Sequence, residues 1–195
     1  MRLFVALDID DPIRRRIADF MQINRAHSPD ARWVRPESLH ITLKFIGEQP
    51  ESALEKITQM LNTTSADAID LNFRGFGFFP TPRSPRVFWI GVESGSNLAA
   101  LAKTIDAKLG TFGAAKEDHP YNPHLTLARA AGGSGSPRRQ KTDRLNSRFQ
   151  LLQEKLSSQP APEFGTMTAR EFFLYQSRLS PGGSQYSKLA GFALR

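Results

Sequence analysis

Two short stretches of the chain carry the same residue pattern, a histidine followed by an apolar residue, a threonine and a leucine. The first occupies residues 40–43 and the second residues 124–127, and the chain has only four histidines. Imidazole titrates near neutral pH, so one ring can accept a proton while another donates one. We therefore interpret His40 and His124 as the general acid and the general base of one site.

Each stretch mixes apolar and β-branched residues with polar ones and follows a proline, which is typical of a β-strand. Residues two apart in a strand share a face, so His40 points with Thr42, and His124 points with Thr126. Two such faces that meet across a cleft would offer two imidazoles, with two hydroxyls that donate to phosphate oxygens. The alternative for these side chains is a structural role in which they bind backbone groups.

Length and composition favour a single domain over residues 1–195 that buries its own core. The absence of cysteine excludes disulfides and fits a reducing cytoplasm, where we place the protein. We see no apolar run long enough for a membrane span. The net charge of +7 suits nucleic acid or another phosphate-bearing partner, although a merely basic protein is the alternative.

A basic cluster after the flexible stretch 131–137 is the best local candidate for an RNA contact, and a solvated loop is the equal alternative. It consists of Arg138, Arg139, Lys141 and Arg144. We interpret His119 as a surface histidine. A metal site built from His119 and His124 is not indicated, since we see no acidic or cysteine partner at ligand spacing. We expect neither a metal nor a cofactor.

Strands and helices alternate in a way that would position the two motifs in two similar α+β lobes. We expect strands at 2–8, 31–35, 39–46, 69–79, 86–92, 169–177 and 186–194. We expect helices at 11–26, 51–62, 142–156 and from Ser96 or Asn97 to 109, the first of them with Asp11 as its cap. Most aromatic residues of the middle segment should be core, and which of them stacks on a base stays open. They are Trp33, Phe76, Phe78, Phe79 and Trp89.

The motifs and their flanks resemble the two-histidine (2H) phosphoesterase superfamily, and more closely its bacterial and archaeal RNA 2′,3′-cyclic phosphodiesterases, also known as 2′-5′ RNA ligases. The segment RWVRPESLHITLKFIGE resembles the first motif block of that family, and NPHLTLAR resembles the second. RLFVALDI resembles its opening strand, and LYQSRLSPGGSQY its C-terminal segment. One such motif occurs by chance in many proteins, but two with these flanks are specific.

The resemblance implies a bilobal α+β fold, with two pseudosymmetric lobes whose antiparallel sheets face a central groove and whose helices pack outside. It implies hydrolysis of RNA 2′,3′-cyclic phosphate ends to 2′-phosphates, and a reverse reaction that ligates RNA. His124 would be the base toward water, and His40 the acid toward the 3′ oxygen. Thr42 and Thr126 would hold the non-bridging oxygens, without a metal. We expect a monomer, and Tyr175 and Tyr186 would flank the groove.

Two cationic residues near the motifs pose a question of strand geometry. The resemblance makes Arg129 a phosphate-binding residue, but simple alternation turns it away from His124 unless the strand ends or bulges near Ala128. Lys44 is four residues after His40, so simple alternation puts the two side chains on the same face of the strand. Lys44 would then lie at the rim of the site or on an exposed part of the strand. Sequence alone does not choose between these placements.

Three functions remain open, the first of them implied by the resemblance. The first is hydrolysis of RNA 2′,3′-cyclic phosphate ends, and the second is the same chemistry on another cyclic or 2′-5′ nucleotide. The third is an RNA-binding module without catalysis, against which the intact histidines and threonines of both motifs argue. Substitution of either histidine separates the third function from the other two, because catalysis should fall far more than binding.

Overall fold

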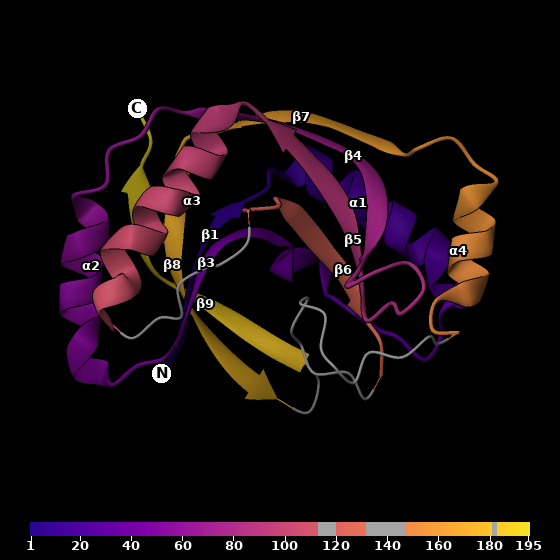
Figure 1. Cartoon of the computed structure of the whole chain (residues 1–195), viewed down its shortest axis with the longest axis horizontal. Helices are drawn as coiled ribbons and strands as arrows, with labels where there is room; N and C mark the ends of the chain where they lie inside the picture. Colours follow the sequence, from indigo (N-terminus) through magenta and orange to yellow (C-terminus); the bar gives the residue numbers. More distant parts are fainter. Residues whose placement is uncertain (113–119, 132–146, 181–182) are drawn as a thin grey trace.

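The structure of the chain is a computed structural model that describes residues 1–112, 120–131, 147–180 and 183–195 (Figure 1). The predicted basic cluster at Arg138, Arg139, Lys141 and Arg144 lies outside the described residues, as does His119. Within the described ranges, no helix is both long enough and apolar enough to cross a membrane.

The strands of the described ranges form one antiparallel sheet, which curls strongly (Figure 1). Its order is β7-β4-β5-β6-β3-β1-β8-β9, with β2 paired to β6 beside this path. The strands are β1 (Arg2–Asp8), β2 (Arg32–Trp33), β3 (His40–Glu48), β4 (Ile69–Phe79), β5 (Val87–Ser94), β6 (His124–Arg129), β7 (Glu163–Ala169), β8 (Glu171–Ser180) and β9 (Gly183–Ala193). The expected α+β class is confirmed, and the two expected sheets are halves of this continuous one.

Helices cover the face of the sheet that forms the main core. They are α1 (Asp11–Asn24), α2 (Leu54–Asn62), α3 (Ser96–Leu109) and α4 (Gln150–Ser157). Helix α1 packs against β7, and α3 packs against β3 and α2. The cap of α1 is Asp10 rather than the predicted Asp11, because the extended Asp10 accepts a hydrogen bond from the Ile13 N–H at 3.1 Å.

Strand β7 is the element that the sequence did not predict. Phe164, Thr166 and Thr168 favour a strand, but they alternate with Glu163, Gly165 and Met167, and Gly165 adopts a positive φ of 108°. Its pairing with β4 along Asp70, Asn72 and their neighbours is what makes it a strand. Helix α4 begins at Gln150, and residues 147–149 before it are not helical, whereas the part of the predicted helix from 142 to 146 lies outside the described residues.

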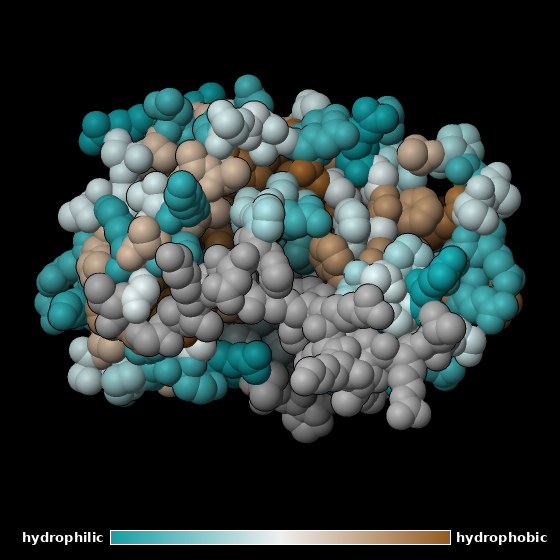
Figure 2. All heavy atoms as spheres, in the orientation of Figure 1, coloured by the Kyte–Doolittle hydropathy of each residue, from teal (hydrophilic) through white to brown (hydrophobic). Residues whose placement is uncertain are grey.

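Strand β1 is buried on both faces, which explains its almost wholly apolar sequence. Its residues 3, 5 and 7 belong to the main core. On the other face, Phe4 and Ala6 form a small separate cluster with Tyr175. Hydrophilic residues predominate along the outline of the face seen in Figure 2, and hydrophobic side chains show in its interior. The second cluster of β1 therefore lies on the face of the sheet opposite the main core.

Candidate active site

The two histidine motifs lie side by side in the middle of the sheet. Strands β3 and β6 are antiparallel, and Ile41 pairs with Leu125, both fully buried in the core. In this register His40 lies across from Thr126, and Thr42 lies across from His124. The two imidazoles and two hydroxyls therefore share the opposite face of the sheet, with approximate two-fold symmetry. We call this the site face.

Both imidazoles are held by the same hydrogen bond. Nδ1 of His40 lies 2.8 Å from the backbone oxygen of Ser38, and Nδ1 of His124 lies 2.8 Å from that of Asn122. A carbonyl oxygen only accepts, so Nδ1 carries the hydrogen in each ring. Nε2 of a neutral ring then has a free lone pair, and Nε2 of a protonated ring can donate. Each histidine is thus built to exchange a proton through Nε2.

Aromatic side chains on the site face fix the two rings. The His40 ring lies 4.9 Å from that of Phe4 and 5.1 Å from that of Tyr186, which meets it edge-on. The ring of His124 meets that of Phe79 edge-on at 4.9 Å. Stacking and edge contacts of this kind limit the rotation of an imidazole. The orientation of Nε2 therefore depends on the neighbouring rings as well as on the backbone bond.

The structure separates the aromatic residues into core and site. Trp89 stacks on Phe79 with ring centroids 4.9 Å apart and lies flat over Gly77, where an added Cβ would meet its ring at 2.1 Å. By contrast, Trp33, Phe76 and Phe78 pack with Phe88 or the rest of the main core. The prediction that most of the five aromatic residues are core is therefore confirmed for Trp33, Phe76 and Phe78. Phe79 and Trp89 instead line the site face.

A β-bulge places Arg129 on the site face. Ala128 and Thr126 pair with adjacent residues of β5, so Leu127 is an extra residue in β6. Leu127 and Ala128 are consecutive and both fully buried, and alternation therefore restarts with Arg129 on the side of His124. This is the bulge near Ala128 that a phosphate-binding role for Arg129 requires.

The matching bulge in β3 has the opposite effect on Lys44. Lys44 pairs with Val5 and Thr42 with Ala6, which leaves Leu43 as the extra residue. Lys44 therefore turns into the core, where it is 1% exposed and forms an ion pair with Asp106 of α3. Both placements that the sequence suggested for Lys44, at the rim and on the exposed strand, are wrong.

Asp8 is a residue of the site that the sequence analysis missed. It pairs with His40 across β1 and β3, on the same face. Its carboxylate accepts a hydrogen bond from the Tyr175 hydroxyl and lies 2.5 Å from Nζ of Lys188. Nζ of Lys188 is also 4.0 Å from the ring centre of Phe173. An acidic residue at the end of a buried strand was the available signal, but nothing in the sequence placed β1 beside the histidine strand.

Burial lowers the pKa of both histidines, and charges around them differ. Burial lowers the pKa of His40 to about 4, and the charges of Arg129 and His124 lower it as well. The hydrogen bond to the backbone of Ser38 and the carboxylate of Asp8 act in the opposite direction and raise it. Burial lowers the pKa of His124 as well; its backbone bond raises it, and Arg129 lowers it further. Both rings are therefore neutral at pH 7 before a substrate binds, and Asp8 favours the proton on His40.

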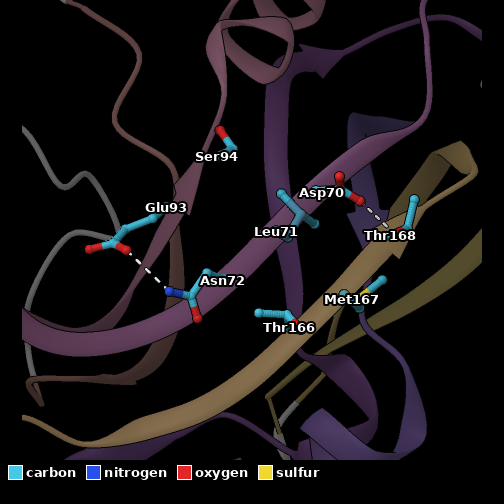
Figure 3. A pocket seen from close by; sticks show the side chains of 8 residues that line it. All are labelled: Asp70, Leu71, Asn72, Glu93, Ser94, Thr166, Met167 and Thr168. Atoms are coloured by element: carbon cyan, nitrogen blue, oxygen red, sulfur yellow. Dashed lines mark hydrogen bonds between the residues drawn. The ribbon is translucent and has the colours of Figure 1, made fainter.

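A hollow of about 620 Å³ continues the site face along β4, β5 and β7 (Figure 3). Glu93, which lines it, is two residues from Gly91, the partner of His124 in the ladder. The amide of Asn72 donates to Glu93 at 3.2 Å, and the hydroxyl of Thr168 donates to Asp70 at 2.6 Å. Its two carboxylates, those of Asp70 and Glu93, would repel an anion, so the hollow is unsuited to a phosphate.

Among the residues that the structure describes, no three histidine, cysteine or acidic side chains come together as a metal site would require. The two motifs and Arg129 bring two imidazoles, two hydroxyls and a guanidinium to the site face, and the carboxylate of Asp8 lies on the same face. Together they provide a base, an acid and donors for a charged oxygen.

The sequence matches the family model of the 2′-5′ RNA ligase superfamily over residues 9–171. It is 37% identical to the RNA 2′,3′-cyclic phosphodiesterase of Archaeoglobus fulgidus, over 98% of this chain and 99% of that protein. It is 32% identical to the protein of the same name from Methanothermobacter thermautotrophicus, over 100% of this chain and 99% of the relative.

Solved structures agree with these matches in fold. TT0787 of Thermus thermophilus superimposes with a TM-score of 0.78 at 26% identity, over 100% of this chain and 98% of that one. Escherichia coli LigT complexed with 3′-AMP superimposes with a TM-score of 0.74 at 26% identity, over 99% and 97%. The similarity thus extends over the whole sheet and both histidine strands.

Proposed function

The chain belongs to the 2′-5′ RNA ligase superfamily, and on this premise we propose that it opens the 2′,3′-cyclic phosphate at the end of an RNA strand to give a 2′-phosphate. The observation that carries the proposal is the facing pair of imidazoles, each with Nδ1 committed to a carbonyl and Nε2 available. The relatives named RNA 2′,3′-cyclic phosphodiesterase support the choice of substrate.

We assign the base to His124. Its pKa is lowered, so its neutral form with a lone pair on Nε2 predominates. Unlike His40, it has no carboxylate among the groups that shift its pKa, and so none that favours a proton on it. Nε2 takes a proton from water as the water oxygen attacks phosphorus. The bond that forms is from the water oxygen to phosphorus, and the proton moves to the imidazole.

We assign the acid to His40. The bond from phosphorus to the 3′ oxygen breaks, and that oxygen takes the proton from Nε2 of His40. The low pKa of the empty site must rise for this role, and a bound anionic phosphate raises it, with Asp8 already acting in the same direction. A phosphate raises the pKa of both rings, whereas Asp8 acts on His40, so the two rings divide the roles.

Thr42, Thr126 and Arg129 serve the charge that develops on phosphorus. The hydroxyls lie across from the histidines of the opposite strand and donate to the non-bridging oxygens. Arg129 influences the pKa of both histidines, and we place its guanidinium beside the phosphate between them. Preorganised hydrogen-bond donors stabilise the transition state most strongly, because the negative charge on the phosphate oxygens is greatest there.

We further propose that residues 1–195 work as one domain and act on RNA as a monomer. The two histidines come from adjacent strands of one sheet, so neither half of the chain holds a complete site. The net charge of +7 suits an anionic strand. The complex of LigT with 3′-AMP supports a nucleotide as the end group that is bound.

The test uses a short RNA that ends in a 2′,3′-cyclic phosphate, incubated with the protein in excess EDTA. We expect a 2′-phosphate, identified by ³¹P NMR, and its loss in His40→Ala and in His124→Ala. His27→Ala provides a matched histidine control, because His27 lies on the turn after α1. Turnover in both site variants would remove the assignment of the two histidines.

The same assay separates the other two functions. Turnover of nucleoside cyclic phosphates or 2′-5′ oligonucleotides without turnover of the RNA end would move the chemistry to a different phosphodiester. Binding of the RNA end by wild-type protein without turnover of any phosphodiester would indicate a binding module.

A further inference from the structure

Strand β2 presents a second arginine to the site face, beside Arg129. Trp33 fixes the strand, because its Nε1 donates to the backbone oxygen of Ser28 at 3.1 Å and its ring meets that of Phe88 at 5.9 Å. Phe88 is fully buried in the main core, so Trp33 faces the core. Successive side chains alternate along a strand, and Arg32 therefore points to the site face.

Arg32 and Arg129 are direct partners in the ladder of β2 and β6. The ladder is continued by the N–H of Val34, which donates to the oxygen of Leu127 at 2.8 Å. Direct partners place their Cβ atoms about 5 Å apart on one face. Burial lowers the pKa of Arg129, Tyr186 raises it, and the guanidiniums of Arg32 and Arg2 lower it. Two guanidiniums thus occupy one short stretch of the site face.

The two arginines differ in depth. Arg129 is half-buried and close enough to both histidines to affect their pKa, whereas Arg32 is exposed. Like charges on direct partners of a ladder repel each other, and an anion between them offsets that repulsion. The positive charge of the site face therefore continues from Arg129 in β6 to Arg32 in the neighbouring strand β2, where a second anionic group could bind.

We propose that Arg32 binds a second phosphate of the RNA, the phosphodiester that joins the terminal nucleotide to the preceding one. This rests on the function proposed above, which places the cyclic phosphate at the histidines and Arg129. A guanidinium forms paired hydrogen bonds with phosphate oxygens, and a basic track is how proteins follow a single strand. A nucleoside 2′,3′-cyclic phosphate has no such phosphodiester, so Arg32 selects RNA strands over single nucleotides.

The experiment compares two substrates, adenosine 2′,3′-cyclic phosphate and a dinucleotide that ends in the same cyclic phosphate. We expect Arg32→Gln to lower kcat/KM for the dinucleotide about tenfold, the effect of one charged hydrogen-bonding contact. For adenosine 2′,3′-cyclic phosphate we expect a change of less than about twofold. Arg32→Lys should fall between wild type and Arg32→Gln on the dinucleotide, because lysine keeps the charge but not the paired donors.

Arg15→Gln is the matched control, since Arg15 is an exposed arginine of α1, on the helix-covered face. It should leave both substrates unchanged. The dependence of log KM on log salt for the dinucleotide should become shallower by about one unit in Arg32→Gln. It should stay the same for the mononucleotide.

Equal losses on both substrates would overturn the proposal, because Arg32 would then act on the terminal phosphate or on the fold. An unchanged dinucleotide rate would overturn it as well. If wild-type protein hydrolysed neither substrate, the proposed function would fail instead. Binding of a dinucleotide with a 2′-phosphate end would then decide about Arg32, and equal affinities of wild type and Arg32→Gln would overturn the subsite.

Discussion

The two halves of the site share a backbone and differ in charge. Each offers a histidine, a threonine two residues later and a bulge at the following leucine. Asp8, however, pairs with His40 and acts on its pKa alone, whereas the guanidinium of Arg129 acts on the pKa of both histidines. The comparison teaches that a symmetric scaffold can serve an asymmetric reaction when the strands next to the motifs supply different charges.

The bulges show the same difference one step further along. In β6 the buried position after the bulge is Ala128, and the next residue, Arg129, returns to the site face. In β3 the buried position is Lys44, and the next residue is Phe45, which is 49% exposed and near Phe4. The β6 half thus adds the positive charge of Arg129 to the site. The β3 half buries the charge of Lys44 in the core and presents the apolar ring of Phe45 instead.

The largest expected effect is the loss of either imidazole. His40→Gln and His124→Gln should each lower kcat about 10³-fold on the RNA end, the usual share of one acid or base. A nucleoside phosphodiester with a 4-nitrophenolate leaving group distinguishes the acid from the base, because this leaving group needs no proton. We expect His40→Gln to recover most of its activity on that substrate and His124→Gln to recover none. The reverse result would exchange the two roles.

Loss of the guanidinium that β6 adds to the site comes next. Arg129→Gln should lower kcat/KM about 100-fold, because the phosphate loses a donor that acts most strongly in the transition state. Phe45→Arg would add a guanidinium at the equivalent position of β3, and we expect it to restore less than a tenth of the lost activity, since it approaches the phosphate from the side of the acid. Steady-state kinetics on the RNA end would measure both, and full activity in Arg129→Gln would contradict the assignment.

Loss of the carboxylate beside His40 should have a smaller effect. Asp8 raises the pKa of His40, so Asp8→Asn should lower that pKa and reduce the protonated fraction of the acid. We expect kcat to fall about tenfold, equal to one pKa unit, and the alkaline limb of the pH profile to move to lower pH. An unchanged limb with a reduced Tm would instead make Asp8 a purely structural residue. Tyr175→Phe, which removes one bond to Asp8, should shift the limb in the opposite sense or not at all.

The pH profile of wild type sharpens the same comparison. kcat/KM reports the free enzyme, in which burial lowers the pKa of both histidines from the ordinary 6.5. We therefore expect a bell with its maximum below pH 6.5 and a decline that already begins below pH 6.5, where the acid loses its proton. The profile of kcat should lie at higher pH, because the bound phosphate raises both pKa values. A rate that rose steadily from pH 5 to 10 would contradict one protonated and one neutral histidine.

The smallest effect on turnover belongs to Lys44. Its side chain is 0% exposed and that of Asp106 is 17% exposed, so Lys44→Met leaves a largely buried carboxylate without this partner. We expect the free energy of unfolding to fall by about 3–5 kcal/mol in urea titrations. The double variant Lys44→Met, Asp106→Leu should recover most of that loss. kcat of the folded protein should stay within about twofold of wild type, and a larger change would bring Lys44 back to the site.

The sequence by itself determined the two motifs, the faces of their first three residues and the α+β class. Alternation along a strand is local, so His40 shares a face with Thr42 whatever surrounds them. Most strands were predictable for the same reason, because their apolar residues fit a sheet with buried faces. Strand β7 was not, since pairing with β4 and not its own composition makes it a strand.

Only the tertiary structure decided the charges of the site. Asp8, Arg32 and the opposite fates of Lys44 and Arg129 depend on which strands are neighbours and where the ladder shifts register. A bulge is a property of two paired strands, and a single-residue shift turns every later side chain to the other face. Long-range pairing cannot be read from residue spacing, and it is this pairing that gives two nearly identical motifs different charged neighbours.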